Sequence, residues 1–332
     1  MFPLVETKER TFTKMEDLRD MIASEKRQLF EVLNCEMALN QDGRLRAGRF
    51  EGPITRSALF GMLNTLGIPV NFVIDVCPID LVVTIVGRLA REKKIQVVVQ
   101  AVDGVATAVM PAHRQPINQD VLIDRLGVKR PIQEAILAGQ FLRLTFADTA
   151  PKELLPNDNF SAGWELTNGE DGWHSTEVWQ FVLRQICSNG MVGFDKTAVF
   201  RRKHNSREPV LKSLEGLVHI IESTVRPLEL EPAIKWAAGK RLGTEHKVVV
   251  DYLSQRLEGD ATKLALDKIT ADESWYDLLN AVTSLARFHR LEIRRRHEIE
   301  GGVLLNWFLQ QGRGQPPWRR VSCDTCEYWP NG

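Results

Sequence analysis

Acidic side chains and a histidine gather in one short segment of the chain, which runs from residue 165 to residue 174. They are Glu165, Asn168, Glu170, Asp171 and His174. Carboxylate and amide oxygens can hold Mg²⁺, and a carboxylate or an imidazole can act as a general base. The run Asn-Gly-Glu-Asp-Gly also suits a tight turn, because Asn and Asp tolerate left-handed backbone and Gly adopts it freely. We favour the turn, with Asn168 and Glu170 as structural residues, and we predict neither a bound metal nor a cofactor.

Basic side chains form two runs further along the chain. Residues 201–204 are Arg-Arg-Lys-His, and residues 294–297 are Arg-Arg-Arg-His. Arg and Lys contacts to phosphates give sequence-independent affinity for nucleic acids, and aromatic rings stack bases in single-strand binders. The sequence therefore predicts a nucleic-acid site made of Arg201, Arg202, Lys203, His204, Arg207 and Trp173. The alternative interpretation is a solvated charged surface, with the tryptophans in the core.

The stretch from residue 184 to residue 192, Arg-Gln-Ile-Cys-Ser-Asn-Gly-Met-Val, is predicted to end a helix that opens near Thr176. Asn189 and Gly190 are of the residue types that terminate helices in the left-handed conformation. Cys187 lies on the apolar face of the predicted helix. We interpret it as a small buried hydrophobe with a structural role rather than as a nucleophile.

Five cysteines are spread widely along the chain, which fits a reducing compartment without a disulfide framework. Only Cys323 and Cys326 have the spacing of zinc ligands, and a structural zinc site needs four. We interpret this pair as part of an irregular tail; a site completed by a histidine is the alternative. The N-terminus shows no secretory signal, and the most apolar run, residues 72–86, is too short for a bilayer. We expect a cytoplasmic protein without a membrane partner.

Charge is balanced overall but divided along the sequence. The chain has 43 basic and 43 acidic side chains, so bulk charge argues against a protein that coats nucleic acid. Residues 147–180 contain seven acidic and one basic side chain, whereas residues 287–320 contain eight Arg and three Glu. Opposite patches of this kind can steer a polyanion or pair subunits head to tail. Separate solvated faces are the alternative interpretation.

Two of these stretches together resemble a known family. Residues 163–170 read Gly-Trp-Glu-Leu-Thr-Asn-Gly-Glu, and Arg-Gln-Ile-Cys-Ser-Asn-Gly-Met follows about twenty residues later. Their order and spacing resemble the core of domain of unknown function 932, a family carried by phages and plasmids. The resemblance covers roughly residues 61–222. The chain departs from the family at Gly169, where the family has Ser, and at residues 111–114, where the family has a Ser-x-x-Tyr-like segment.

Strand signals are clearest around a predicted hairpin. Residues 95–102 are rich in β-branched side chains, Asp103-Gly104 is a strong hairpin turn signal, and residues 105–110 return as a second strand. Phe141 to Phe146 alternates apolar and polar residues, and Gly163 to Leu166 is a further strand candidate. We predict that the hairpin and the strand 141–146 share one antiparallel sheet, with the helix 176–186 packed on one face.

Helical spacing and end signals predict the remaining elements. The segments are 13–29, 55–66, 78–91, 118–126, a turn at 133–137, and then 210–224, 232–238, 247–257, 261–268 and 273–287. The predicted class is α+β, with an antiparallel sheet core, packed helices and a mainly helical C-terminal part. The predicted organisation is an N-terminal helical segment (1–60), an α+β core (61–225), a helical C-terminal region (226–310) and an irregular tail (311–332).

The predicted function combines the basic runs with the mobile-element setting that the resemblance implies. We expect a non-enzymatic nucleic-acid-handling protein of a phage or plasmid in a bacterial host cell. It would bind or anneal single strands in recombination or replication and work as a homo-oligomer. The alternatives are a metal-dependent enzyme acting on nucleic acid or nucleotides through residues 165–174, and a protein-binding assembly or anti-defence factor. The motifs of P-loop, dinucleotide-binding, α/β-hydrolase and zincin enzymes are absent from the sequence.

Overall fold

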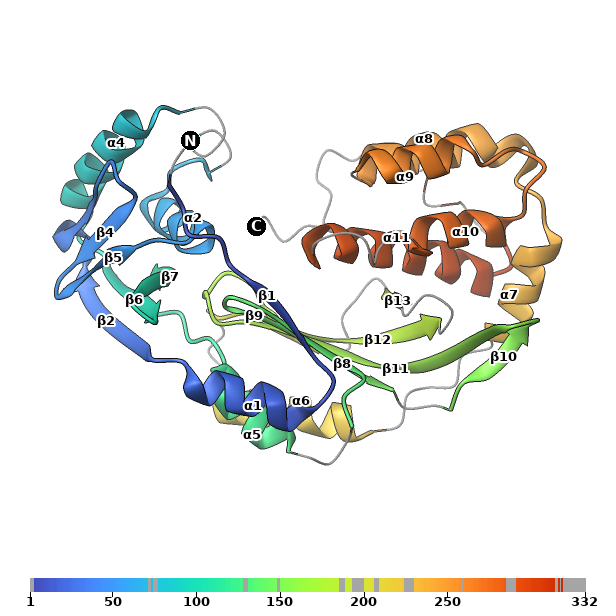
Figure 1. The fold of residues 1–332 in the computed structure, drawn as a ribbon, viewed down its shortest axis with the longest axis horizontal. Helices are drawn as coiled ribbons and strands as arrows, with labels where there is room; N and C mark the ends of the chain where they lie inside the picture. The colour runs from blue at the N-terminus through green and yellow to red at the C-terminus, as the bar shows by residue number, and fades with distance from the viewer. Residues whose placement is uncertain are drawn as a thin grey trace. The chain divides into compact units, whose positions relative to one another are not determined.

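Two compact units make up the protein in the computed structural model (Figure 1). Unit 1 contains Met1–Leu144, Leu166–Glu177 and Phe200–Ile220, and unit 2 contains Thr145–Glu165, Val178–Val199 and Ile221–Gly332. The structure describes residues 3–70, 73, 77–127, 131–147, 150–184, 189–192, 200–205, 209–223, 230–257, 259–284, 291–313, 316 and 318. Antiparallel sheets followed by a mainly helical C-terminal part confirm the predicted α+β class.

The first sixty residues form more strand than helix, and the predicted helix 13–29 is present only over residues 15–24. The elements are β1 (Glu9–Phe12), α1 (Met15–Ser24), β2 (Arg27–Leu33), η1 (Asn34–Glu36), β3 (Met37–Leu39), β4 (Arg44–Ala47) and β5 (Phe50–Pro53). The prediction extended α1 to Leu29 because that residue continues its apolar spacing. In the structure Leu29 lies in β2 and pairs with Gln100. Pairing with a distant strand therefore overrides the local helical pattern.

The predicted hairpin is confirmed as β6 (Gln96–Val102) and β7 (Val105–Pro111). Asp103 and Gly104 have φ angles of 51° and 78°, as a tight hairpin turn requires. The hairpin continues β2 in a three-stranded sheet of order β2-β6-β7, while β3, β4 and β5 form another three-stranded sheet. The strand 141–146 lies in a different sheet, so the prediction that it shares one with the hairpin is wrong.

Two helices with clear end signals cover the core of unit 1. In α2 (Arg56–Leu66), the Thr55 hydroxyl accepts a hydrogen bond from the N–H of Ala58 at 3.2 Å, and Gly67 ends the helix with a φ of 74°. Pro78 precedes α4 (Ile79–Glu92) as predicted. Figure 1 shows α2 beside β7, and buried side chains of α2, α4 and the two small sheets form one apolar cluster.

A larger sheet has the order β1-β8-β9-β11-β12-β13, with β10 paired to β11 and β14 paired to β12. The strands after β1 are β8 (Glu134–Ala138), β9 (Phe141–Ala147), β10 (Lys152–Leu155), β11 (Asp158–Gly169), β12 (Thr176–Arg184), β13 (Asn189–Val192) and β14 (Phe200–Arg202). The helices α5 (Gln119–Leu126) and α6 (Val210–Glu222) match their predictions closely. The predicted turn at 133–137 is instead part of strand β8.

The predicted helix 176–186 is wrong, because residues 176–184 form strand β12. Thr176, Val178 and Val182 are β-branched, lie at even spacing and are buried. Such residues fit a pleated surface, and neighbouring strands decide the outcome here. Asn189 and Gly190 likewise belong to β13, where they pair with Arg184 and Leu183. They therefore do not end a helix.

Helices dominate the C-terminal part of the chain, as predicted. They are α7 (Leu230–Gly239), α8 (His246–Arg256), α9 (Asp260–Asp267), α10 (Trp275–Ser284) and α11 (Leu291–Leu309), with a short helix η3 (Gly243–Glu245). Five aromatic rings pack together in unit 2, with neighbouring centroids 4.6–6.3 Å apart. They belong to Trp236, Trp275, Trp307, Phe308 and Trp318. Most of the predicted tail, including Cys323 and Cys326, lies outside the described residues.

Candidate functional site

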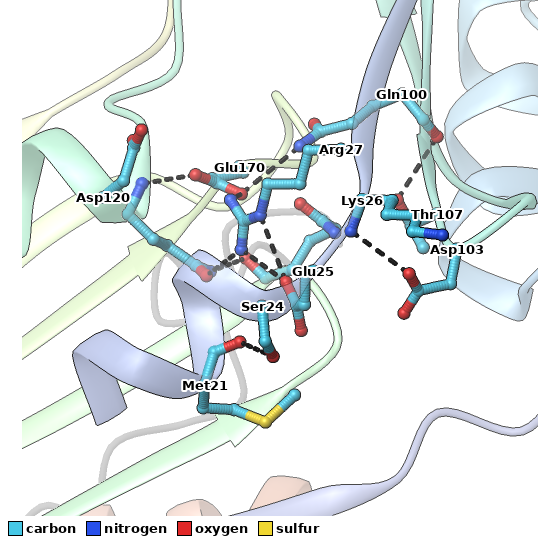
Figure 2. A network of polar contacts seen from close by, with 12 residues as sticks. Met21, Ser24, Glu25, Lys26, Arg27, Gln100, Asp103, Thr107, Asp120 and Glu170 are labelled. Atoms are coloured by element: carbon cyan, nitrogen blue, oxygen red, sulfur yellow. Dashed lines mark hydrogen bonds and ion pairs between the residues drawn. The ribbon is translucent and has the colours of Figure 1, made fainter. Parts of the chain in front are cut away.

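Glu170 directly follows β11 and joins four parts of unit 1 (Figure 2). One carboxylate oxygen is 2.6 Å from Nη1 of Arg27 and accepts a hydrogen bond from Gln100 at 3.3 Å. The other accepts the backbone N–H of Gln119, the first residue of α5. The backbone N–H of Glu170 donates to the carbonyl of Gln140 at 2.9 Å. Glu170 thus links β2, β6, α5 and the β8–β9 turn, which is a structural role.

The Arg27 side chain makes further contacts besides its ion pair with Glu170. Its guanidinium also contacts Glu25 at 2.9 Å and the side-chain oxygen of Gln119 at 3.1 Å. Burial raises the pKa of the Glu170 carboxyl, and the pairing with Arg27 and the hydrogen bonds from Gln119 and Gln100 offset only part of that shift. The carboxyl is 1% exposed, so it is poorly placed to meet a substrate from solvent.

Asp171 shapes the turn between β11 and β12. One carboxylate oxygen accepts the backbone N–H groups of Trp173 and His174, both at 2.9 Å. The other lies 2.5 Å from Nδ1 of His174 and accepts the Ser57 hydroxyl at 3.3 Å. Burial alone would raise the pKa of Asp171, but the contacts with His174 and Trp173 outweigh it and hold that pKa well below its usual range. A carboxylate–imidazole pair can support general-base chemistry, yet here the carboxylate is also used to fix the turn.

Asn168 anchors the same region to the chain before α5. Its side-chain amide donates to the carbonyl of Ile117 at 2.9 Å, and its oxygen accepts the hydroxyl of Thr176 at 2.6 Å. Ile117, Asn168 and Thr176 are all buried. The geometry assigns Asn168 a structural role across the β11–β12 pair.

His204 is a buried imidazole beside this turn. It is 3% exposed, and its Nε2 donates to the backbone carbonyl of His174. Its Nδ1 is buried and has no hydrogen-bond partner among the described residues. Burial lowers the pKa of His204, and nearby Arg202 and Arg114 act in the same direction against the carbonyl and Asp171. The neutral imidazole is therefore the form that fits this place.

The predicted nucleic-acid residues do not form one exposed basic surface. Arg202 is buried, and its guanidinium donates to Ser213 at 3.1 Å and to the carbonyl of Gln115 at 2.7 Å. Arg201 is paired with Glu177 at 2.7 Å. Trp173 donates its indole N–H to the carbonyl of Val109. Buried groups of this kind cannot reach a phosphate, which corrects the prediction for Arg202 and His204.

The other predicted site residues are partly or fully exposed, lie outside the described residues or are described only as backbone. Lys203 is exposed. The guanidinium carbon of Arg114 lies 3.7 Å from the ring centroid of Trp173, so a cation already covers one face of that indole. Arg207 and Cys187 lie outside the described residues. Asn189 and Gly190 are described only as backbone of β13.

The second basic run belongs to α11 in unit 2 and is also paired. Arg295 forms an ion pair with the buried carboxylate of Glu165, and Arg294 pairs with buried Glu298 at 3.0 Å. His297 is fully buried between Thr262 and the carbonyl of Val282. Arg294, Arg295 and His297 are thus tied to groups inside the unit.

Three arginines of the β4–β5 hairpin are exposed to solvent and, among the described residues, unpaired, unlike the paired arginines of the two basic runs. Arg44 and Arg46 are exposed on one face of β4, where they alternate with the buried Leu45 and Ala47, and Arg49 is exposed in the following turn. In the part of the chain that the structure describes, none of these three guanidinium groups has a hydrogen bond or ion pair. Residues 41–49 read as a polar basic loop in the sequence and were not among the predicted site residues, whereas residues 44–47 form strand β4. The alternation of basic and apolar residues from 44 to 47 was the available signal.

One acidic residue, Glu51, lies directly across the hairpin from these arginines. Glu51 of β5 is the Cα partner of Arg46, yet no ion pair joins the two side chains. The neighbouring cross-strand positions are Pro53, opposite Arg44, and Phe50, opposite Ala47. We call Arg44, Arg46 and Arg49 the hairpin arginines.

Comparisons with known proteins leave the family open. No protein-family model, no curated protein and no solved structure matches the chain. The resemblance to domain of unknown function 932 therefore stays a prediction. Within the described ranges, no group of three or more His, Cys, Asp or Glu side chains is arranged to hold a metal ion. The described helices also include none that is both long and apolar enough to cross a membrane.

Proposed function

We propose that the protein binds nucleic acid through the phosphate backbone and that the hairpin arginines make the contacts. The observation behind the proposal is that Arg44, Arg46 and Arg49 are exposed and unpaired on one hairpin, whereas the basic runs at 201–202 and 294–295 are paired internally. Guanidinium groups bind phosphate oxygens with two parallel hydrogen bonds, and they hold their charge at any physiological pH.

The aromatic side chains of the protein favour contacts to the phosphate backbone of the nucleic acid over contacts to its bases. Single-strand binders that stack bases need exposed aromatic rings, and Trp164 and Trp173 do not supply them. Trp164 is buried, and the ring of Trp173 is covered by Arg114. The affinity proposed for the hairpin arginines is therefore electrostatic, independent of base sequence and sensitive to salt.

The first prediction concerns this affinity. A variant with Arg44→Gln, Arg46→Gln and Arg49→Gln is expected to lose most binding to a fluorescent oligonucleotide in anisotropy titrations. Each neutralised phosphate contributes about 0.9 to the slope of log affinity against log salt for duplex DNA, so three lost contacts flatten the slope by about 2 to 3. Titrations between about 50 and 200 mM salt, with single-stranded and duplex probes, measure this directly.

A matched control changes the net charge by the same amount elsewhere. Arg88, Lys235 and Arg241 are exposed cations that are each paired with an acid, at 2.9, 2.8 and 3.0 Å. Their replacement by Gln is expected to leave both affinity and salt slope close to those of the wild type. Equal losses in both variants, or no wild-type binding at low salt, would rule the proposal out.

A further inference from the structure

Strand β2 forms one edge of the sheet β2-β6-β7. Its register with β6 runs from Arg27 opposite Val102 to Leu33 opposite Gln96. The carbonyl of Lys26 accepts the N–H of Asp103, and the N–H of Asn34 donates to Ile95, at 3.1 and 2.9 Å. Antiparallel pairs alternate, so the even-numbered residues of β2 bond to β6. The odd-numbered residues direct their backbone groups to the outer edge.

The outer edge of β2 is open at its centre. The N–H of Arg27 donates to the carbonyl of Glu25, and the N–H of Leu33 donates to the Glu36 carboxylate, both at 3.1 Å. For Leu29 and Glu31, the described residues provide no hydrogen-bond partner to the outward N–H and C=O groups. An edge with unpaired backbone groups is a template for another strand.

Side chains beside this edge are apolar and exposed. Leu29 is 64% exposed and Leu33 is 43% exposed, both on the face that also carries Glu31. The opposite face of β2 contains Phe30 and Val32, which pack on the core cluster of unit 1. A partner on this edge would thus gain main-chain hydrogen bonds and contact with two leucines.

We propose that this edge pairs antiparallel with β2 of a second copy of the chain, about a two-fold axis at Phe30. In that register Leu29 of one copy faces Glu31 of the other, and both open N–H groups and both open C=O groups of each copy find partners. Leu29 of one copy lies diagonal to Leu33 of the other, a distance at which long side chains interact. One strand supplies both halves of a self-complementary interface, as a two-fold dimer requires.

Other self-pairings of β2 are poorer. An axis at Glu31 would place two carboxylates directly opposite each other, which destabilises a strand pair. An axis at Leu29 would use the N–H of Arg27, which already bonds to Glu25. The axis at Phe30 avoids both problems and joins the exposed leucines of the two copies into one apolar strip. This inference is independent of the proposed nucleic-acid binding.

Sedimentation equilibrium of the full chain tests the proposal. The wild type is expected to show a reversible monomer–dimer equilibrium, and Leu29→Lys is expected to weaken dimerisation at least tenfold. Glu31→Pro removes an outward N–H without touching the β6 ladder and is expected to have the same effect. Leu211→Lys, at a leucine that is 58% exposed on α6, is the control and should dimerise like the wild type.

Every outcome of this experiment decides the proposal. Dimers in the wild type and control, with monomers in Leu29→Lys, support it, and circular dichroism confirms that each variant is folded. A wild type that stays monomeric at all concentrations overturns it and leaves the edge to a different protein strand. A Leu29→Lys variant that dimerises as strongly as the wild type also overturns it, because the interface must then lie elsewhere.

Discussion

Burial and pairing act on Glu170 in opposite directions. Burial in unit 1 disfavours the carboxylate, whereas Arg27, Gln100 and Gln119 stabilise it. A buried ion pair adds little net stability over an apolar pair of the same shape, but a single charge left without its partner is costly. The stability of this region therefore depends on keeping both members of the pair.

The second prediction follows from that asymmetry. Glu170→Ala is expected to lower the free energy of unfolding by about 2 to 3 kcal/mol, because it leaves Arg27 and the N–H of Gln119 without their acceptor. The double variant Arg27→Met with Glu170→Leu is expected to recover part of that loss. Urea denaturation followed by circular dichroism measures both. Glu51→Ala, at an exposed carboxylate, is the control, and an equal effect there would contradict the structural role of Glu170.

The third prediction is a pH dependence from His204. Its pKa in the fold is below the ordinary value of 6.5, so the unfolded chain takes up a proton that the folded chain does not. Stability from this group is complete above the unfolded pKa and falls as the pH drops from about 7 toward the folded pKa. The slope is at most about 1.4 kcal/mol per pH unit for one proton.

His204→Gln isolates this contribution from the other histidines. The variant is expected to show a shallower loss of stability between about pH 7 and pH 5 than the wild type, because it lacks the titrating imidazole. Thermal midpoints at several pH values provide the comparison. Parallel pH profiles for the two proteins would show that His204 does not titrate differently in the folded and unfolded chains.

At the scale of elements, α2 lies unusually close to β7. Gly61 sits in the middle of the helix, and a β-carbon there would meet the backbone carbonyl of Val109 and the indole nitrogen of Trp173 at less than contact distance. That indole also donates to the same carbonyl at 3.2 Å. The absence of a side chain at Gly61 permits this packing.

The fourth prediction compares two helical glycines. Gly61→Ala is expected to destabilise the protein by about 1 to 3 kcal/mol, because overpacking against backbone exceeds the helix propensity gained. Gly87→Ala in α4 is expected to stabilise it by about 0.5 to 1 kcal/mol, since nothing lies within 4 Å of the added carbon. Thermal unfolding distinguishes the two. Stabilisation by Gly61→Ala would show that α2 can move away from β7 at little cost.

For the whole molecule, the acidic and basic segments of the sequence contribute side chains to ion pairs within the units. The acidic segment 147–180 and the basic segment 287–320 meet in unit 2, where Glu165 pairs with Arg295. Within unit 1, Arg201 pairs with Glu177 of the acidic segment. Part of the predicted opposite patches is thus neutralised inside each unit. The hairpin arginines remain exposed and unpaired among the residues that the structure describes.

Local signals in the sequence were sufficient for many elements. Thr55 and Gly67 mark the ends of α2, Pro78 marks the start of α4, and Asp103-Gly104 closes the β6–β7 hairpin. These signals act through hydrogen bonds and backbone angles within a few residues, so they can be read without knowing the fold. The helical C-terminal part was predictable for the same reason. The suitability of residues 168–172 for a tight turn was also visible.

Only the tertiary structure decided the roles that depend on distant partners. Residues 176–184 carry apolar spacing that fits a helix or a strand, and pairing with β13 and neighbouring strands made them β12. The sequence could not show that Arg202 is buried, that Arg295 meets Glu165 or that Arg44, Arg46 and Arg49 stay unpaired. Strand pairing and ion pairing join residues far apart in the chain, and their free energy depends on which neighbours the fold brings into contact.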